Sequence, residues 1–85
     1  MINLDIANLR FRAMNVQGCY MAGIDNEKVK KVLLDGDDKI RYTFYCDVNN
    51  GFAILHKTDV AGNIVVADNE IVYELFFGKV EVILK

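Results

Sequence analysis

The chain has 85 residues, 53% of them hydrophobic, and its 10 basic and 12 acidic side chains give a formal net charge of −2. This length predicts a single domain spanning residues 1–85. The small, dispersed charge excludes binding to nucleic acid or to an anionic membrane that is driven by the field of the whole molecule. The sequence shows neither a signal peptide nor an apolar run long enough to span a bilayer, so we expect a cytoplasmic protein without membrane contact.

The N-terminal part of the chain is predicted to form short β-strands. Residues 1–8 carry apolar side chains at even positions, which is typical of an edge strand or an ordered arm. These side chains are Ile2, Leu4 and Ile6. In residues 9–14 apolar and arginine side chains alternate, which predicts a strand with Arg10 and Arg12 on its exposed face. A partner strand at 19–22 is expected after a turn.

Residues 25–34 fit two structures. Asp25 can cap a helix, and Val29, Val32 and Leu33 recur at helical spacing. The same residues can form a strand that pairs with the next one through the acidic turn 35–38, so both alternatives stay open. That turn lacks the ligand spacing of a calcium-binding loop, and we expect it to be solvated.

The segment 39–57 (KIRYTFYCDVNNGFAILHK) predicts a β-hairpin. In its first arm, apolar residues alternate with polar ones in the period-two pattern of a strand. The inward-facing residues are expected to be Ile40, Tyr42, Phe44, Cys46 and Val48, and the outward-facing residues Arg41, Thr43, Tyr45 and Asp47. Asn50-Gly51 supplies a tight two-residue turn, which would place Cys46 opposite Leu55 and His56 opposite Tyr45.

The C-terminal third predicts three more strands, at 64–67, 71–77 and 79–85, with turns between them. Short strands separated by turns every eight to twelve residues indicate a mainly β fold. We expect a small antiparallel barrel-like or sandwich domain, of the SH3-like or OB-like kind, with at most one short helix at 25–34.

Few residues in the chain suggest catalysis. His56 is the single histidine, the chain has no serine, and Cys19 and Cys46 are expected to be free, buried thiols. Zinc-ligand spacings and glycine-rich phosphate loops are absent from the sequence. We therefore expect no enzyme activity, no catalytic residues, no metal and no cofactor.

Two surface features suggest binding instead. Arginine beside tyrosine suits stacking on a base or anchoring a protein partner, although it is also common on an ordinary solvated sheet. The candidate contact residues are Arg10, Arg12, Arg41 and Tyr45. The segment 72–77 is apolar on both faces, so one core cannot bury all of it, and we expect a homo-oligomer. The expected interface residues are Tyr73, Phe76 and Phe77.

Several short segments are similar to one known family. They are the tripeptide Phe11-Arg12-Ala13, the turn Asp59-Val60-Ala61-Gly62, Val65, and the acidic turn Asp68-Asn69-Glu70 before Ile71-Val72. In these segments the chain resembles the YopX-type proteins of phages and prophages. It departs from them at Met14, where tryptophan is usual, and at Asn69-Glu70, where a Gly-Asp pair lies one residue away. The resemblance implies a small β-rich accessory protein of a bacterial virus, located in the host cytoplasm.

The sequence thus favours a non-enzymatic binding protein. We expect it to occupy or sequester a host partner, such as a defence protein, or the nucleotide-type ligand of that partner. The alternative is a small barrel that binds single-stranded nucleic acid through Arg10, Arg12, Arg41 and Tyr45. The third hypothesis is an enzyme whose motif the sequence does not reveal.

Overall fold

The computed structural model describes residues 5–85, and this range contains one helix and nine strands. They are α1 (Ile6–Asn15), β1 (Cys19–Met21), β2 (Val29–Leu34), β3 (Asp37–Asp38), β4 (Thr43–Asp47), β5 (Phe52–His56), β6 (Val66–Ala67), β7 (Glu70–Ile71), β8 (Tyr73–Phe77) and β9 (Val80–Leu84). All the named strand pairs are antiparallel. The prediction of a mainly β, antiparallel fold with at most one short helix is confirmed.

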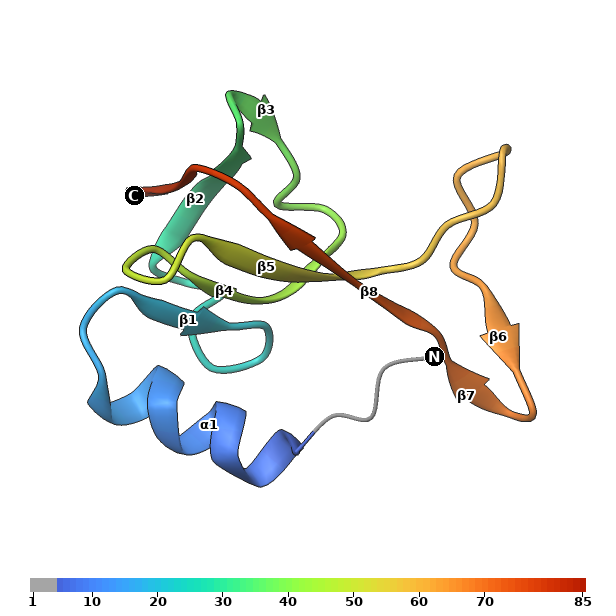
Figure 1. Ribbon diagram of the computed structural model, residues 1–85, viewed down its shortest axis with the longest axis horizontal. Coiled ribbons are helices and arrows are strands. Elements are labelled where there is room, and N and C mark those ends of the chain that lie inside the picture. Colours follow the sequence, from blue (N-terminus) through green and yellow to red (C-terminus); the bar gives the residue numbers. More distant parts are fainter. Residues whose placement is uncertain (1–4) are drawn as a thin grey trace.

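The strands form three sheets (Figure 1). The four-stranded sheet has the order β1-β4-β5-β8, and the three-stranded sheet has the order β3-β2-β9. The β6–β7 hairpin stands away from these two sheets (Figure 1, orange). The chain passes from the first sheet to the second at Gly78, between β8 and β9. The predicted strand at 71–77 is therefore divided, because Ile71 pairs within the small hairpin and Tyr73 pairs with β5.

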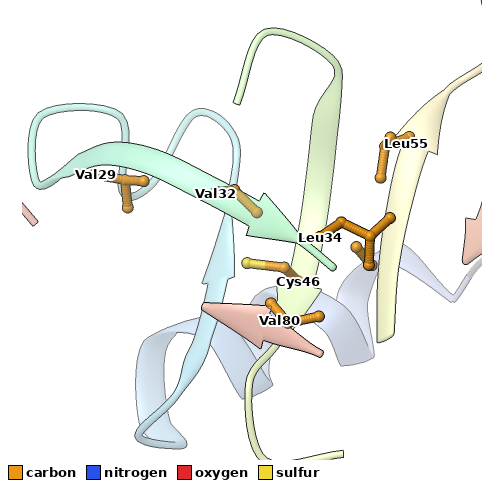
Figure 2. Packing of buried hydrophobic residues seen from close by; sticks show 7 residues of the cluster. Val29, Val32, Leu34, Cys46, Leu55 and Val80 are labelled. Atoms are coloured by element: carbon orange, nitrogen blue, oxygen red, sulfur yellow. The ribbon is translucent and has the colours of Figure 1, made fainter. Parts of the chain in front are cut away.

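A hydrophobic core lies between the two larger sheets (Figure 2). We call the face of the four-stranded sheet that contacts this core its inner face. The core residues are Val29, Val32 and Leu34 of β2, Cys46 of β4, Ala53 and Leu55 of β5, and Val80 of β9. Figure 2 shows the side chains of β2, β4 and β9 directed toward one another. Burial of apolar surface between the sheets is the main force that holds them together.

A second core lies on the opposite, outer face of the four-stranded sheet, where α1 packs beside β1 (Figure 1). Its buried residues are Cys19, Met21, Tyr45 and Ile54, and the partly buried Leu9, Ala13 and Val16 pack against them. Both faces of the sheet are thus covered at β4. This double cover decides which side chains of β4 remain at the surface.

The N-terminal strand predicted at 9–14 is wrong, because Ile6–Asn15 form the helix α1. Leu9 and Ala13 are four residues apart, so they satisfy a helical period as well as an alternating one. Phe11 distinguishes the two, since it is 63% exposed in the helix and would be buried in the predicted strand. Asp5 caps the helix by accepting a hydrogen bond from the Asn8 N–H (3.1 Å). Of the predicted edge strand at 1–8, Ile2 and Leu4 lie outside the described residues.

Of the two alternatives for residues 25–34, the helix is wrong and the strand is correct. Val29, Val32 and Leu34 of β2 are buried. Their uneven spacing resembled a helix because the pairing of β2 with β9 shifts register between Val29 and Lys31. Such a bulge places an extra residue in one strand and changes which side chains face the core.

The central hairpin is confirmed, but its predicted register is wrong. Asp47 pairs with Phe52 and Cys46 pairs with Ala53, so the connecting loop is 48–51 instead of Asn50-Gly51 alone. The Asp47 side chain accepts hydrogen bonds from the backbone N–H (2.9 Å) and the side-chain amide (2.8 Å) of Asn50. This carboxylate organises the longer loop, and the prediction from Asn50-Gly51 did not include it.

The exposed position predicted for Tyr45 is also wrong, because this side chain is 0% exposed. The pairing of β4 with β5 shifts register between Thr43 and Tyr45, which breaks the alternation along the strand. Tyr45, Cys46 and Asp47 are consecutive and all buried. The face predicted to be solvated is the outer face, which α1 covers in part.

Candidate functional site

A pocket of about 240 Å³ opens where the four-stranded sheet meets β2. Its apolar lining includes the buried residues Met21, Val29, Val32 and Cys46. The turns that precede β2 and β4, the first residue of β4 and the last residue of β5 contribute its polar lining. These polar residues include Asp25, Asn26, Arg41, Thr43 and His56. We call this space the inter-sheet pocket.

Three of the polar side chains that line the inter-sheet pocket already have partners in the fold. Asp25 accepts a hydrogen bond from the Met21 N–H (2.9 Å) and lies 3.8 Å from the ammonium of Lys28. The Thr43 hydroxyl donates to a backbone carbonyl (2.7 Å), and the Asn26 carbonyl oxygen accepts from a backbone N–H (3.2 Å). Each of these bonds holds one of the two turns in place.

Arg41 and His56 differ from the other polar residues of this pocket. Arg41 is exposed, and its guanidinium carbon lies 5.8 Å from the centre of the Tyr42 ring. The His56 ring is half-buried and stacks against Phe44 (5.8 Å) and Tyr73 (5.4 Å). Neither side chain makes a hydrogen bond or an ion pair with another residue in the range 5–85. Burial lowers the pKa of His56, so the imidazole is neutral near pH 7.

Cys46 lines the same pocket as His56, as a cysteine nucleophile and a histidine base would do. Burial, together with smaller contributions from nearby Cys19 and Asp47, raises the pKa of the Cys46 thiol to about 12. A nucleophilic cysteine needs the opposite shift, toward the thiolate at neutral pH. Both cysteines are free and buried, as predicted, and they occupy different cores.

Two of the predicted contact residues, Arg12 and Tyr45, belong to a network on the outer face of the sheet. Arg12 of α1 donates hydrogen bonds from Nε to the Tyr45 hydroxyl (3.3 Å) and from Nη2 to Asp47 Oδ2 (3.2 Å). These two bonds raise the pKa of Arg12. Burial raises the pKa of Tyr45 to about 12. Burial would also raise the pKa of Asp47, but hydrogen bonds from Asn50 and Arg12 outweigh it and lower that pKa.

The remaining predicted residues lie in separate places. Arg10 is exposed on α1, and Arg41 lies in the turn before β4. The structure therefore joins the half-buried Arg12 to the buried Tyr45 and does not bring all four contact residues together in one surface. On β8, Tyr73 is half-buried, whereas Phe76 is 38% and Phe77 73% exposed.

The sequence-based reasoning missed two buried carboxylates, Asp25 and Asp47, which are 5% and 0% exposed. Asp25 lies in the turn between β1 and β2, and Asp47 ends β4 just before a turn, and aspartate often bonds to the backbone at such positions. This preference of aspartate was the sequence signal that could have indicated the two residues. The pocket itself had no sequence signal, because β1, β2, β4, β5 and the turns between them contribute residues to it from separate segments of the chain.

Residues 5–85 contain no group of three or more histidine, cysteine, aspartate or glutamate side chains arranged to hold a metal ion. The described helix is too short to cross a membrane. No protein-family model, curated protein or solved structure matches the chain.

Proposed function

We propose that this protein is a small non-enzymatic binding protein and that it assembles through the free side of β8, which we call the β8 edge. β8 is the last strand of the four-stranded sheet, and in the described part of the chain it pairs only with β5. An edge strand whose outer backbone groups are unpaired, and which carries exposed apolar side chains, is a template for pairing with another strand. This feature of β8 is the observation that carries the proposal.

The backbone of β8 presents unpaired groups along this edge. The Gly78 N–H donates to the Gly51 carbonyl (2.9 Å), and the Val72 carbonyl accepts from the Lys57 N–H (2.8 Å). Backbone groups alternate in direction along an antiparallel strand, so the even-numbered residues between 72 and 78 bond toward β5. The odd-numbered residues direct their N–H and C=O groups away from it. These residues are Tyr73, Leu75 and Phe77.

The side chains of β8 add apolar surface on both faces of the sheet. Leu75 and Phe77 pair with Ile54 and Phe52 and lie on the outer face, beyond the part that α1 covers. Leu75 is 40% exposed and Phe77 73% exposed. Phe76 projects from the inner face and is 38% exposed. Full burial of one such side chain contributes about 1.5–3 kcal/mol before the costs of association.

The occupant that fits this edge best is a second copy of the chain in antiparallel orientation. A two-fold axis at Leu75 would place Tyr73 opposite Phe77 of the second copy and would pair the outward-facing backbone groups of both strands. Glu74 would lie opposite Phe76 of the second copy, so no two carboxylates would face each other directly. The interface predicted from Tyr73, Phe76 and Phe77 fits this arrangement.

The dimer would leave Arg10 and Arg41 free to contact a host partner. The nucleic-acid alternative is less well supported, since Tyr45 is buried and Arg12 is engaged in hydrogen bonds with Tyr45 and Asp47. An enzyme is also less well supported, because the pKa of Cys46 is raised instead of lowered. Binding of single-stranded oligonucleotides that weakens steeply with salt and is lost in Arg41→Ala would favour the nucleic-acid alternative.

Light scattering at micromolar concentration tests the assembly. We expect a mass of twice 9.6 kDa for the wild-type chain. Phe77→Glu should restore the monomer mass, because it places a charge in the two-fold interface. The matched control is Phe11→Glu, which changes a phenylalanine of similar exposure (63%) on α1 and should leave the dimer intact. A wild-type mass of 9.6 kDa would contradict the proposed assembly.

A second variant has the opposite expected effect. In the two-fold arrangement the two Glu74 side chains lie diagonally across the axis, at a separation where like charges repel. Glu74→Gln should therefore strengthen dimerisation, and the strengthening should decrease as salt concentration rises. If Glu74→Gln has no effect while Phe77→Glu abolishes the dimer, β8 is part of the interface but the axis is not at Leu75.

A further inference from the structure

The inter-sheet pocket combines apolar walls with two polar side chains, Arg41 and His56, that make no hydrogen bond to another residue in the range 5–85. Its interior is formed by the buried, apolar Val29, Val32 and Cys46, and its lining extends to the exposed Arg41. Figure 2 shows Val32 and Cys46 directed toward each other from β2 and β4. Ligand pockets commonly combine apolar walls with a small number of polar groups that fix the orientation of the ligand.

The polar side chains that have no partner in the fold determine which chemical group a ligand of this pocket must carry. Arg41 is a hydrogen-bond donor only and always charged, so its complement is an anionic acceptor. Asp25, Thr43 and Asn26 already bond to the backbone, and the charge of Asp25 is balanced in part by Lys28. The fold therefore offers a free cation at this pocket, whereas its carboxylate is occupied.

The size of the pocket limits the ligand to a small molecule. A volume of about 240 Å³ lies below the range of roughly 300–1,000 Å³ that is typical of drug-sized ligands. A molecule with one ring and a short side chain matches this space better than a complete nucleotide does. His56 adds a neutral imidazole that can donate or accept one hydrogen bond beside the ring.

We propose that the inter-sheet pocket binds a small aromatic carboxylate. The ring lies against Val29, Val32 and Cys46, and the carboxylate accepts hydrogen bonds from the guanidinium of Arg41. The site is independent of the proposed dimer, because no residue of β8 is among the residues that line this pocket in the described chain. The two proposals can therefore fail separately.

Titration of the ¹⁵N-labelled full chain with phenylacetate tests the proposal, using amide chemical shifts as the signal. We expect saturable shifts of Val29, Val32 and Cys46 in the millimolar range. The neutral isostere phenylacetamide should bind more weakly, and the cationic benzylamine should not compete. Absence of saturable shifts with phenylacetate, or tighter binding of benzylamine, would overturn the proposal.

Two arginine variants make the test specific. Arg41→Gln removes an exposed side chain and is expected to fold normally, and it should weaken phenylacetate binding at least about tenfold, the loss expected for one charge-assisted hydrogen bond. Its affinity for phenylacetamide should change much less. The matched control Arg10→Gln, on α1, should bind phenylacetate as the wild-type chain does. Equal phenylacetate affinity of Arg41→Gln and the wild type would also overturn the proposal.

Discussion

Arg12 of the helix and Asp47 of β4 form an ion pair of 3.2 Å in which the carboxylate is completely buried and the arginine side chain is 35% exposed. The pair joins segments that lie 35 residues apart in the chain. It holds α1 on the outer face of the four-stranded sheet, and the same carboxylate organises the loop between β4 and β5. One buried charge therefore connects the helix, the sheet and the central hairpin.

The first prediction follows from the burial of Asp47. Asp47→Ala should lower the free energy of unfolding by roughly 3 kcal/mol, the upper part of the range for hydrogen bonds to a charged group. Asp37→Ala is the matched control, because Asp37 is exposed in β3 and should change stability by no more than about 0.5 kcal/mol. Urea denaturation of both variants provides the measurement. Equal stabilities would mean that the Arg12–Asp47 pair does not stabilise the fold.

The helix offers a second matched comparison. Arg12→Met removes both hydrogen bonds from α1 to β4, whereas Arg10→Met changes an exposed arginine of the same helix. We expect Arg12→Met to increase amide hydrogen exchange throughout α1 and Arg10→Met to leave it unchanged. If exchange in α1 responds equally to both changes, apolar packing of Leu9 and Ala13 holds the helix without the ion pair.

The third prediction concerns two glycines with positive φ. Gly51 (φ 68°) lies where an added Cβ would be 2.8 Å from the carbonyl oxygen of Gly78, whereas Gly36 (φ 90°) has open space around it. Gly36→Ala should therefore lose only about 1–2 kcal/mol from its left-handed backbone conformation. Gly51→Ala should be the less stable of the two, because it adds a clash with backbone. Thermal denaturation that ranks the two variants in the reverse order would contradict this account.

The fourth prediction is a loss of stability in mild acid. Burial lowers the pKa of His56 below its usual 6.5, so the unfolded chain takes up a proton at a higher pH than the folded chain does. The contribution of His56 to stability is complete above pH 6.5 and decreases as the pH falls below that value. The rings of Phe44 and Tyr73 that stack on the imidazole offer no charge that would favour the protonated form.

Urea midpoints measured at several pH values between 8 and about 5 test the contribution of His56. The lowered pKa of Asp47 acts in a separate window, since its contribution is lost only as the pH falls below about 3.8. His56→Gln should reduce the change in the urea midpoint across the mild-acid range. An unchanged slope in this variant would assign the pH dependence to other groups.

The fifth prediction concerns alkaline pH. Burial raises the pKa values of Cys46 and Tyr45 to about 12, above the ordinary values of 9.0 and 10.0 that we expect in the unfolded chain. The folded protein therefore retains protons that the unfolded chain releases, and stability should decrease as the pH rises above 9. Cys46→Ala should make the decrease smaller between pH 9 and 10. The absorbance of tyrosinate should show one of the four tyrosines titrating late in the wild-type chain.

The alternating patterns of the sequence determined much of the strand content. The hairpin around Asn50-Gly51 and the C-terminal strands β8 and β9 all form where the patterns predicted strands. Arg41, which was predicted as a contact residue, lies at the inter-sheet pocket. The pocket itself could not be predicted, because its walls come from four strands whose contact depends on how the two sheets pack.

The sequence also determined that Leu9 and Ala13 would face a core, but it did not determine the secondary structure that presents them. Both residues satisfy a period of two and a period close to four, so the local pattern is ambiguous. Only the tertiary structure selects the helix, by offering the outer face of the sheet to Leu9 and Ala13 and a buried carboxylate to Arg12.

Tyr45 is a second residue whose surroundings the local sequence pattern did not determine. Its place opposite the predicted apolar stripe indicated a solvated face, since an isolated antiparallel sheet often has one face in water. The register shift at β4 and the helix on the outer face place Tyr45 in a second core instead. Alternation along one strand specifies two faces, but the elements that cover each face come from distant parts of the chain, and only their packing decides which face is exposed.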